Sequence, residues 1–189
     1  GAKVVLVNPE DYVQHIDFLN KAVYTKNDLS FLKEVAKAVV DSGRGAGVDG
    51  YEEFAASVKD VAVSDDAKAV ADMYLEAKKA MIVFNQNLIT TEAASLLADI
   101  ALVSGHIGTP RDGILQVKAK NNSQGLVDLG ITAGAEELEG VKALVVFGEE
   151  ADIDTDALEF LAVSDTHMTA LAAKADVVIP GTGFASTDG

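Results

Sequence analysis

The sequence contains no cysteine and only three histidines. Iron–sulfur clusters are normally held by cysteine thiolates, so this chain cannot hold a cluster of that kind, and it cannot form a disulfide. His15, His106 and His167 are far apart in the sequence and lack the short spacing that metal ligands usually show. We therefore expect no metal site here, and we interpret the histidines as structural or solvent-facing.

Basic residues are also scarce. The 189 residues include 15 lysines and arginines against 30 aspartates and glutamates, which gives a formal net charge of −15 at pH 7. This charge repels nucleic-acid backbones and anionic membrane surfaces, so we expect no nucleic-acid partner. Because no run of 18 apolar residues occurs and the start lacks a signal-peptide pattern, we also expect no direct membrane insertion and a cytoplasmic location.

Hydrophobic residues make up 49% of the chain, which predicts a folded core. Short apolar runs alternate with segments of helical periodicity, a pattern typical of an α/β fold. We predict a mostly parallel, Rossmann-like, doubly wound sheet with helices on both faces. The expected strands are residues 4–7, 81–84, 114–117, 143–147, 160–163 and 177–179, and the expected helices are residues 29–41, 51–58, 65–80, 90–104, 122–129, 155–158 and 166–173. Asn27 or Asp28 would cap the first helix.

The segment 121–130, NNSQGLVDLG, combines carboxamides, a carboxylate and two glycines just after an expected strand. Carboxamides both donate and accept hydrogen bonds, and glycine allows close backbone approach, so a ligand-contacting loop is one interpretation. A polar helix start followed by a glycine stop is the other. The contacts to a ligand would come from Asn121, Asn122 and Gln124.

Polar residues follow several of the expected strands, where parallel sheets bind ligands. These are Asn85, residues 148–150 and Asp165. The Asp165 carboxylate could accept hydrogen bonds from a guanine edge, with Thr169 offering its hydroxyl to the same ligand. Alternatively, Asp165 is only the N-cap of the next helix. Two adjacent glutamates at 149 and 150 would disfavour a phosphate beside them.

The motif HIGTP at 106–110, followed by NNSQGLVDLG at 121–130, resembles the molybdopterin oxidoreductase superfamily, which includes formate dehydrogenase catalytic subunits. Residues 162–189 resemble the same superfamily, with a strand that ends in Asp165 and an ADVVIP strand at 175–180. Near the start, residues 3–9 and 26–28 resemble its "strand, D/N-P" and "G-T-D" elements. The resemblance covers almost the whole chain.

The form Val7-Asn8-Pro9 looks most like the large iron–sulfur subunit of NADH:quinone oxidoreductase (complex I) and its formate dehydrogenase relatives. Formate dehydrogenases usually carry arginine after this proline, whereas Glu10 follows here. This favours an α/β scaffold beside iron–sulfur clusters carried elsewhere in the chain. The alternative is the part of a formate dehydrogenase-like molybdenum or tungsten enzyme that binds molybdopterin guanine dinucleotide. A generic nucleotide-binding domain is more remote, because no G-x-G-x-x-G or Walker loop is present.

The resemblance also implies an organisation. Residues 1–45 would be the end of a preceding α/β domain, and residues 46–189 would be a Rossmann-like domain truncated at its C-terminus. We expect a fragment without catalytic residues or bound cofactor of its own, joined to other domains of the same chain and to other subunits of a redox complex. Any dinucleotide would be bound in the full-length parent, at the residues that match the superfamily motifs: Asn8, Asp28, Asn121, Asn122, Gln124, Asp165 and Thr169.

Overall fold

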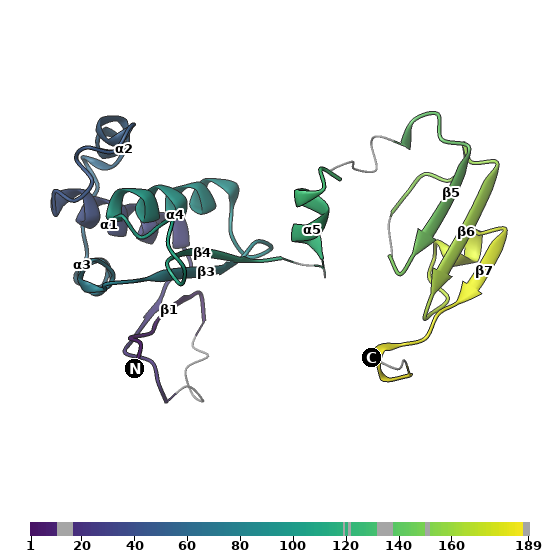
Figure 1. Ribbon diagram of the computed structural model, residues 1–189, viewed down its shortest axis with the longest axis horizontal. Coiled ribbons are helices and arrows are strands. Elements are labelled where there is room, and N and C mark those ends of the chain that lie inside the picture. The colour runs from purple at the N-terminus through teal and green to yellow at the C-terminus, as the bar shows by residue number, and fades with distance from the viewer. Residues whose placement is uncertain (11–16, 119, 121, 132–137, 150–151, 187–189) are drawn as a thin grey trace. The chain divides into compact units, whose positions relative to one another are not determined.

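The computed structural model describes residues 1–10, 17–118, 120, 122–131, 138–149 and 152–186. The chain divides into two compact units, Gly1–Gln124 and Gly125–Gly189, which are described separately below (Figure 1). The division falls inside α5 (Ser123–Asp128). The domain boundary predicted at residues 45 and 46 lies within the first unit, and the assignment of these ranges to two domains stays a prediction.

The described residues of the first unit before α5 form two short parallel sheets and four α-helices. Strand β1 (Val5–Asn8) pairs with β2 (Lys21–Tyr24), and β3 (Met81–Asn85) pairs with β4 (Gly113–Val117). The helices are α1 (Asp28–Asp41), α2 (Tyr51–Val58), α3 (Asp65–Glu76) and α4 (Thr91–Ser104). Helix α1 packs against the other three helices and so forms the centre of this unit.

Side chains from these helices form the main core. Val39, Val58 and Ile100 are among its fully buried members, contributed by α1, α2 and α4. Val23 of β2 joins the same core, and Val7 of β1 and Ile82 of β3 pack against it while partly buried. Removing these aliphatic groups from water is the main favourable term that holds the helices to the strands.

The helix starts follow from the local sequence. Ser64 and Thr90 precede α3 and α4, and each accepts a hydrogen bond from a backbone N–H three residues on. For α1, Asn27 is the N-cap, and its Oδ1 accepts from Ser30 N at 3.0 Å. The sequence left the cap open between Asn27 and Asp28, and the structure assigns it to Asn27. These caps satisfy backbone donors that the first turn of a helix leaves unpaired.

The second unit is built on one sheet of three parallel strands. The strands are β5 (Ala143–Phe147), β6 (Phe160–Asp165) and β7 (Val177–Pro180), in the order β5-β6-β7. Two short 3-10 helices follow β6 and β7, η3 (Ala172–Lys174) and η4 (Phe184–Ser186). A second, smaller core contains Leu161, Val163, Leu171 and Ala172.

The predicted α/β class is confirmed, since parallel strands alternate with helices. Among the described residues the strands form three separate sheets. Two predicted helices are wrong: residues 155–158 form a turn, and only residues 172 and 173 of the expected helix 166–173 are helical, as part of the 3-10 helix η3. Helices of so few turns are marginal without a large apolar face to bury. None of the helices in the described part of the chain is long and apolar enough to span a membrane.

Candidate functional site

The carboxyl edge of the β5-β6-β7 sheet brings together Gly148 after β5, Asp165 at the end of β6 and Gly181 after β7. The backbone is fixed at this edge by two hydrogen bonds, from Gly148 N to Ser164 O and from Gly181 N to Asp165 O, both 2.8 Å. The carboxylate of Asp165 therefore projects from a rigid backbone at the edge where parallel sheets bind ligands.

Asp165 is half-buried, and one of its oxygens is already engaged. Oδ1 accepts from the backbone N–H of Thr166 at 2.6 Å and from its hydroxyl at 3.4 Å. Oδ2 has no hydrogen-bond partner among the residues that the structure describes. Asp165 does not cap an α-helix, because the residues after it are a bend and a turn. Thr169, in the same connection, accepts from Ala172 N at 3.1 Å and so caps the turn into η3.

In the first unit, Asn8 lies at the end of β1 and Asp28 at the start of α1. Asn8 ends β1, and its side-chain Nδ2 donates to Glu10 O at 2.7 Å, which leaves its Oδ1 as an acceptor. The backbone of Asn8 accepts from Thr25 N at 3.0 Å and so links the ends of β1 and β2. Asp28 is the first residue of α1, with Oδ1 2.8 Å from Leu29 N. Both side chains are held in place by local hydrogen bonds.

The segment 121–130 contains helix α5, which ends at a glycine. Asn121 lies outside the described residues, and Asn122 adopts a left-handed backbone with φ +59°. Gln124 is exposed in the first turn of α5. At the other end, Gly130 has φ +73°, and Gly130 N and Ile131 N donate to Val127 O and Leu126 O. This is the Schellman arrangement, so the glycine-stop interpretation is confirmed, and ligand contact stays a prediction.

Six of the seven predicted residues, all but Asn121, are described, and they are divided between the units. Asn8, Asp28, Asn122 and Gln124 belong to the first, and Asp165 and Thr169 belong to the second. In the second unit, Asp165 ends β6 and Thr169 lies in the stretch that follows it. In the first, Asn8 and Asp28 belong to the β1-β2-α1 region, whereas Asn122 and Gln124 lie after β4.

A polar cluster that the sequence did not reveal lies beside α3. His106 Nδ1 is 3.1 Å from Asp112 Oδ1, and His106 Nε2 is 2.9 Å from the carbonyl oxygen of Tyr74. The Tyr74 ring packs edge-on against the imidazole, with centroids 4.7 Å apart, and burial raises the pKa of its hydroxyl. Asp112 also accepts from Ala80 N at 3.0 Å. These contacts hold loops together, so we interpret the cluster as structural.

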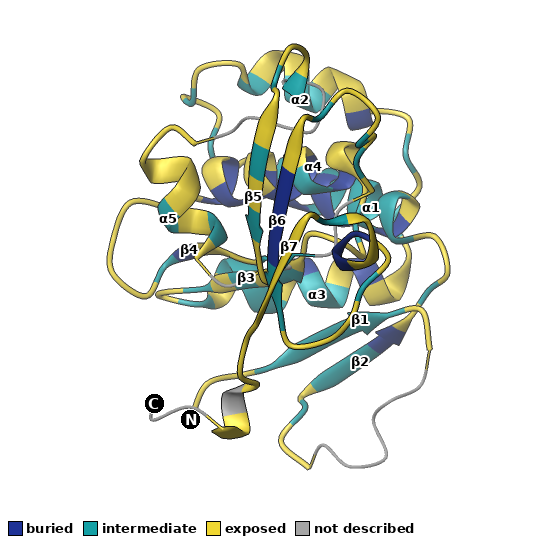
Figure 2. Cartoon of the chain, turned by 90° about the vertical axis from the view of Figure 1, so that its right-hand side faces the viewer, coloured by how far each residue is buried: buried dark blue, intermediate teal, exposed yellow. Residues whose placement is uncertain are grey.

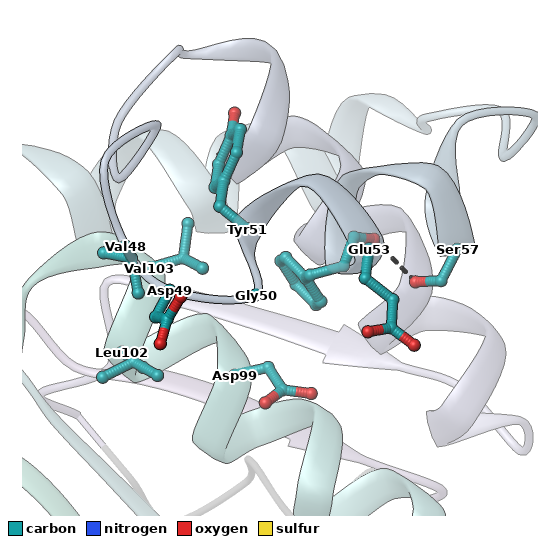
Figure 3. Close-up of a pocket in the computed structure, with 10 residues that line it drawn as sticks. Val48, Asp49, Gly50, Tyr51, Glu53, Ser57, Asp99, Leu102 and Val103 are labelled. Atoms are coloured by element: carbon teal, nitrogen blue, oxygen red, sulfur yellow. Dashed lines mark hydrogen bonds between the residues drawn. The ribbon is translucent and has the colours of Figure 1, made fainter.

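A cavity of about 330 Å³ lies between α2, α4 and the residues before α2 (Figure 3). Asp49, Glu53 and Asp99 line it together with apolar side chains that include Leu102. Burial raises the pKa of Asp99. Three carboxylates disfavour an anionic cofactor there. Within the described ranges, no group of three or more histidine, cysteine, aspartate or glutamate side chains is arranged to hold a metal ion.

This chain was compared with known proteins, and the similarity to one of them covers the whole chain. No family model matches it. Formate dehydrogenase H of Escherichia coli is 22% identical, with 100% of this chain and 36% of that protein covered. The F420-dependent formate dehydrogenase 1 subunit alpha of Methanococcus maripaludis is 27% identical over 72% of this chain and 27% of its own length. A third relative, the F420-dependent formate dehydrogenase subunit alpha of Methanocaldococcus jannaschii, is 24% identical over 63% of this chain and 25% of its own length.

The chain is similar to formate dehydrogenase H and to formate dehydrogenase alpha subunits. This supports, at low identity, the resemblance to molybdopterin oxidoreductases. Because these relatives are formate dehydrogenases, the comparison favours the formate dehydrogenase alternative over the interpretation as a subunit of complex I. The chain spans about a third or less of the length of these relatives.

Proposed function

We propose that this chain is the molybdopterin-guanine-dinucleotide-binding part of a formate dehydrogenase-like molybdenum or tungsten oxidoreductase. The observation that carries the proposal is Asp165, at the carboxyl end of a central parallel strand, whose Oδ2 has no partner within the described residues. It agrees with relatives that are formate dehydrogenases.

Within each unit taken by itself, the predicted residues have the chemistry that the guanine end of such a dinucleotide needs. A guanine base presents neighbouring N–H donors, and a carboxylate accepts two hydrogen bonds in that geometry. Asp165 Oδ2 in the second unit and Asn8 Oδ1 in the first are acceptors to which no described residue donates. Asn121, Asn122 and Gln124 would add carboxamides, and Asp28 and Thr169 a carboxylate and a hydroxyl. Glu10 and Glu149, near two of the strand ends, suit a pyrophosphate poorly, so we assign this chain to the base and ribose.

The metal held by the pterin would supply the redox chemistry when the cofactor is bound. The chain has no cysteine to ligate a metal or an iron–sulfur cluster, so its own residues bind and orient the dinucleotide. We therefore propose that residues 1–45 and 46–189 belong to two domains of a longer polypeptide. Other domains of that polypeptide would carry the rest of the enzyme. The proposal also includes other subunits of a cytoplasmic redox complex, since two of the relatives are themselves named as alpha subunits.

A second candidate keeps the fold and removes the cofactor. Glu10 stands after Pro9, where formate dehydrogenases usually carry arginine, and it takes away a cation that would face a phosphate. This favours a scaffold domain in an electron-transferring subunit that resembles the large iron–sulfur subunit of complex I.

Metal and pterin analysis separates the two candidates. The full-length parent protein is purified anaerobically, and molybdenum, tungsten, iron, released pterin and released guanine nucleotide are each measured per polypeptide. Stoichiometric pterin and guanine nucleotide with molybdenum or tungsten would support the enzyme. Iron without pterin, molybdenum or tungsten would overturn it in favour of the scaffold.

A further inference from the structure

One face of the β5-β6-β7 sheet is apolar and uncovered in the described part of the second unit. The strand register places Val145, Phe147, Phe160, Val177 and Ile179 on the same face, because paired residues in neighbouring strands point the same way. These side chains are 52%, 72%, 41%, 43% and 48% exposed. Figure 2 shows β5 and β7 as largely exposed strands on either side of the more buried β6.

The opposite face is covered over β5 and β6 by the two connections between the strands, whereas Val178 of β7 on that side is 39% exposed. Leu144, Val146, Leu161 and Val163 point to that side and pack with Leu158 from the β5–β6 connection and with Leu171 from the β6–β7 connection. Successive right-handed crossovers that add strands in one direction run over the same face of a sheet. The local topology therefore leaves the face with Phe147 without a covering element from these connections.

Such a face is expected to be buried in the working protein. Parallel sheets occur almost only with both faces covered, and a contiguous apolar patch usually marks an interaction site. Phe147 and Phe160 are aromatic, the type of side chain that contributes most at interfaces. What covers this face must come from outside the strand connections.

The charge of the second unit restricts what that can be. Residues 125–189 contain 13 of the 30 acidic residues but only two of the 15 basic ones, Lys142 and Lys174. Lys142 is already paired with Glu159 at 3.3 Å. A second copy of the chain would bring the same excess of negative charge to the interface, and an anionic membrane surface would be repelled.

We propose that this face is the docking site for an amphipathic helix of a partner polypeptide, with an apolar stripe flanked by lysine or arginine. Apolar residues at i, i+3, i+4 and i+7 would lie across β5, β6 and β7, and the basic flanks would meet the acidic surroundings. The proposal does not depend on whether a pterin dinucleotide is bound.

Peptide binding to the whole 189-residue chain tests this. The probe is a fluorescent helical peptide of about 18 residues, leucine on one face and lysine on the other, long enough for a stripe to cross the sheet. Fluorescence anisotropy compares the chain with two variants. Phe147→Asp disrupts the apolar face. Met168→Asp adds the same charge at a 70% exposed position of the same unit, outside the sheet.

If the face is the docking site, Phe147→Asp should bind the peptide at least about tenfold more weakly than the unchanged chain. Met168→Asp should bind the peptide equally well or slightly more tightly. Val177→Asp, on the other edge strand, should weaken binding as well, and circular dichroism verifies that both variants fold. Equal or tighter binding by Phe147→Asp would mean that charge alone attracts the peptide, and it would overturn the proposal. So would equal affinity for a leucine/glutamate peptide, or a stable dimer of the chain that Phe147→Asp dissociates.

Discussion

His106 Nδ1 lies 3.1 Å from Asp112 Oδ1, and the two side chains are only 5% and 7% exposed. The second ring nitrogen of His106 faces the Tyr74 carbonyl, which can only accept. Both imidazole nitrogens therefore face acceptor oxygens. The pair joins the end of α3 to the turn that leads into β4.

The first prediction concerns acid stability. The backbone N–H of Ala80 lowers the pKa of Asp112, and hydrogen bonding and charge attraction from His106 lower it further. A lowered carboxyl pKa stabilises the fold fully above the unfolded value of about 3.9, and this contribution is lost as the pH falls through the folded value. Asp112→Asn should destabilise the fold at pH 7 and flatten the acid limb of its pH profile.

Urea unfolding between pH 2.5 and 7 measures this. Asp60→Asn is the matched control, because the Asp60 side chain is 89% exposed. Its nearest cation, Lys59 Nζ, is 4.0 Å from Asp60 Oδ2, so the pair is weak. It should change the free energy of unfolding by no more than about 0.5 kcal/mol. An acid limb that is equally steep in Asp112→Asn and in the parent chain would show that Asp112 does not carry the effect.

A second prediction concerns close packing at Gly45. Gly45 has φ +82°, and a Cβ there would lie 2.3 Å from Val103 O and 2.8 Å from Val103 Cγ1. Gly43 has φ +73° but nothing within 4 Å of such a Cβ. Gly43→Ala should cost about 1 kcal/mol for the left-handed backbone alone. Gly45→Ala should cost about 1–3 kcal/mol more, because α4 must move. Equal unfolding midpoints in urea would contradict this.

Much of the fold could be predicted from local patterns. Helices α1, α3 and α4 were expected within a few residues, because each combines a capping residue with apolar positions at helical spacing. Strand β2 was missed, since its four residues carry little apolar pattern and are held by pairing with β1, 16 residues earlier along the chain. Tertiary pairing of that kind leaves a weak local signal.

The candidate site was predictable to the same extent. Asp165 was expected at a strand end and lies there, because the apolar run before it marks a buried strand. The link between His106 and Asp112 was missed. It depends on the fold bringing Tyr74 and Ala80 to the same place, and no short motif encodes that arrangement.

The third prediction separates capping from ligand binding at the start of α1. Asn27→Ala removes the acceptor for Ser30 N and should cost about 1 kcal/mol of stability. Asp28→Asn keeps an oxygen beside Leu29 N and loses only a favourable charge in the first turn, worth about 0.3–1 kcal/mol. Thermal unfolding of the two variants compares them. A larger loss for Asp28→Asn would show that Asp28, and not Asn27, stabilises the helix start.

The fourth prediction uses two carboxylates on opposite edges of one sheet. Asp165 ends β6, whereas Asp176 precedes β7 and its Oδ2 accepts from Leu161 N at 2.8 Å. In the proposed parent enzyme, Asp165→Asn can keep the oxygen that Thr166 N uses, but it would place an amide where the guanine needs an acceptor. Guanine dinucleotide retention should fall roughly tenfold or more, with little change in stability.

Asp176→Asn should do the reverse, because it weakens a charge-assisted hydrogen bond far from the carboxyl edge. We expect a loss of about 0.5–1.5 kcal/mol in unfolding free energy and unchanged nucleotide content per folded polypeptide. Guanine nucleotide released by acid and the urea midpoint are measured on both proteins. If Asp165→Asn retained its full nucleotide content in a parent that does contain the dinucleotide, Asp165 would not contact the base. The guanine would then have to be bound by the carboxamides at 121–124 or by Asp28.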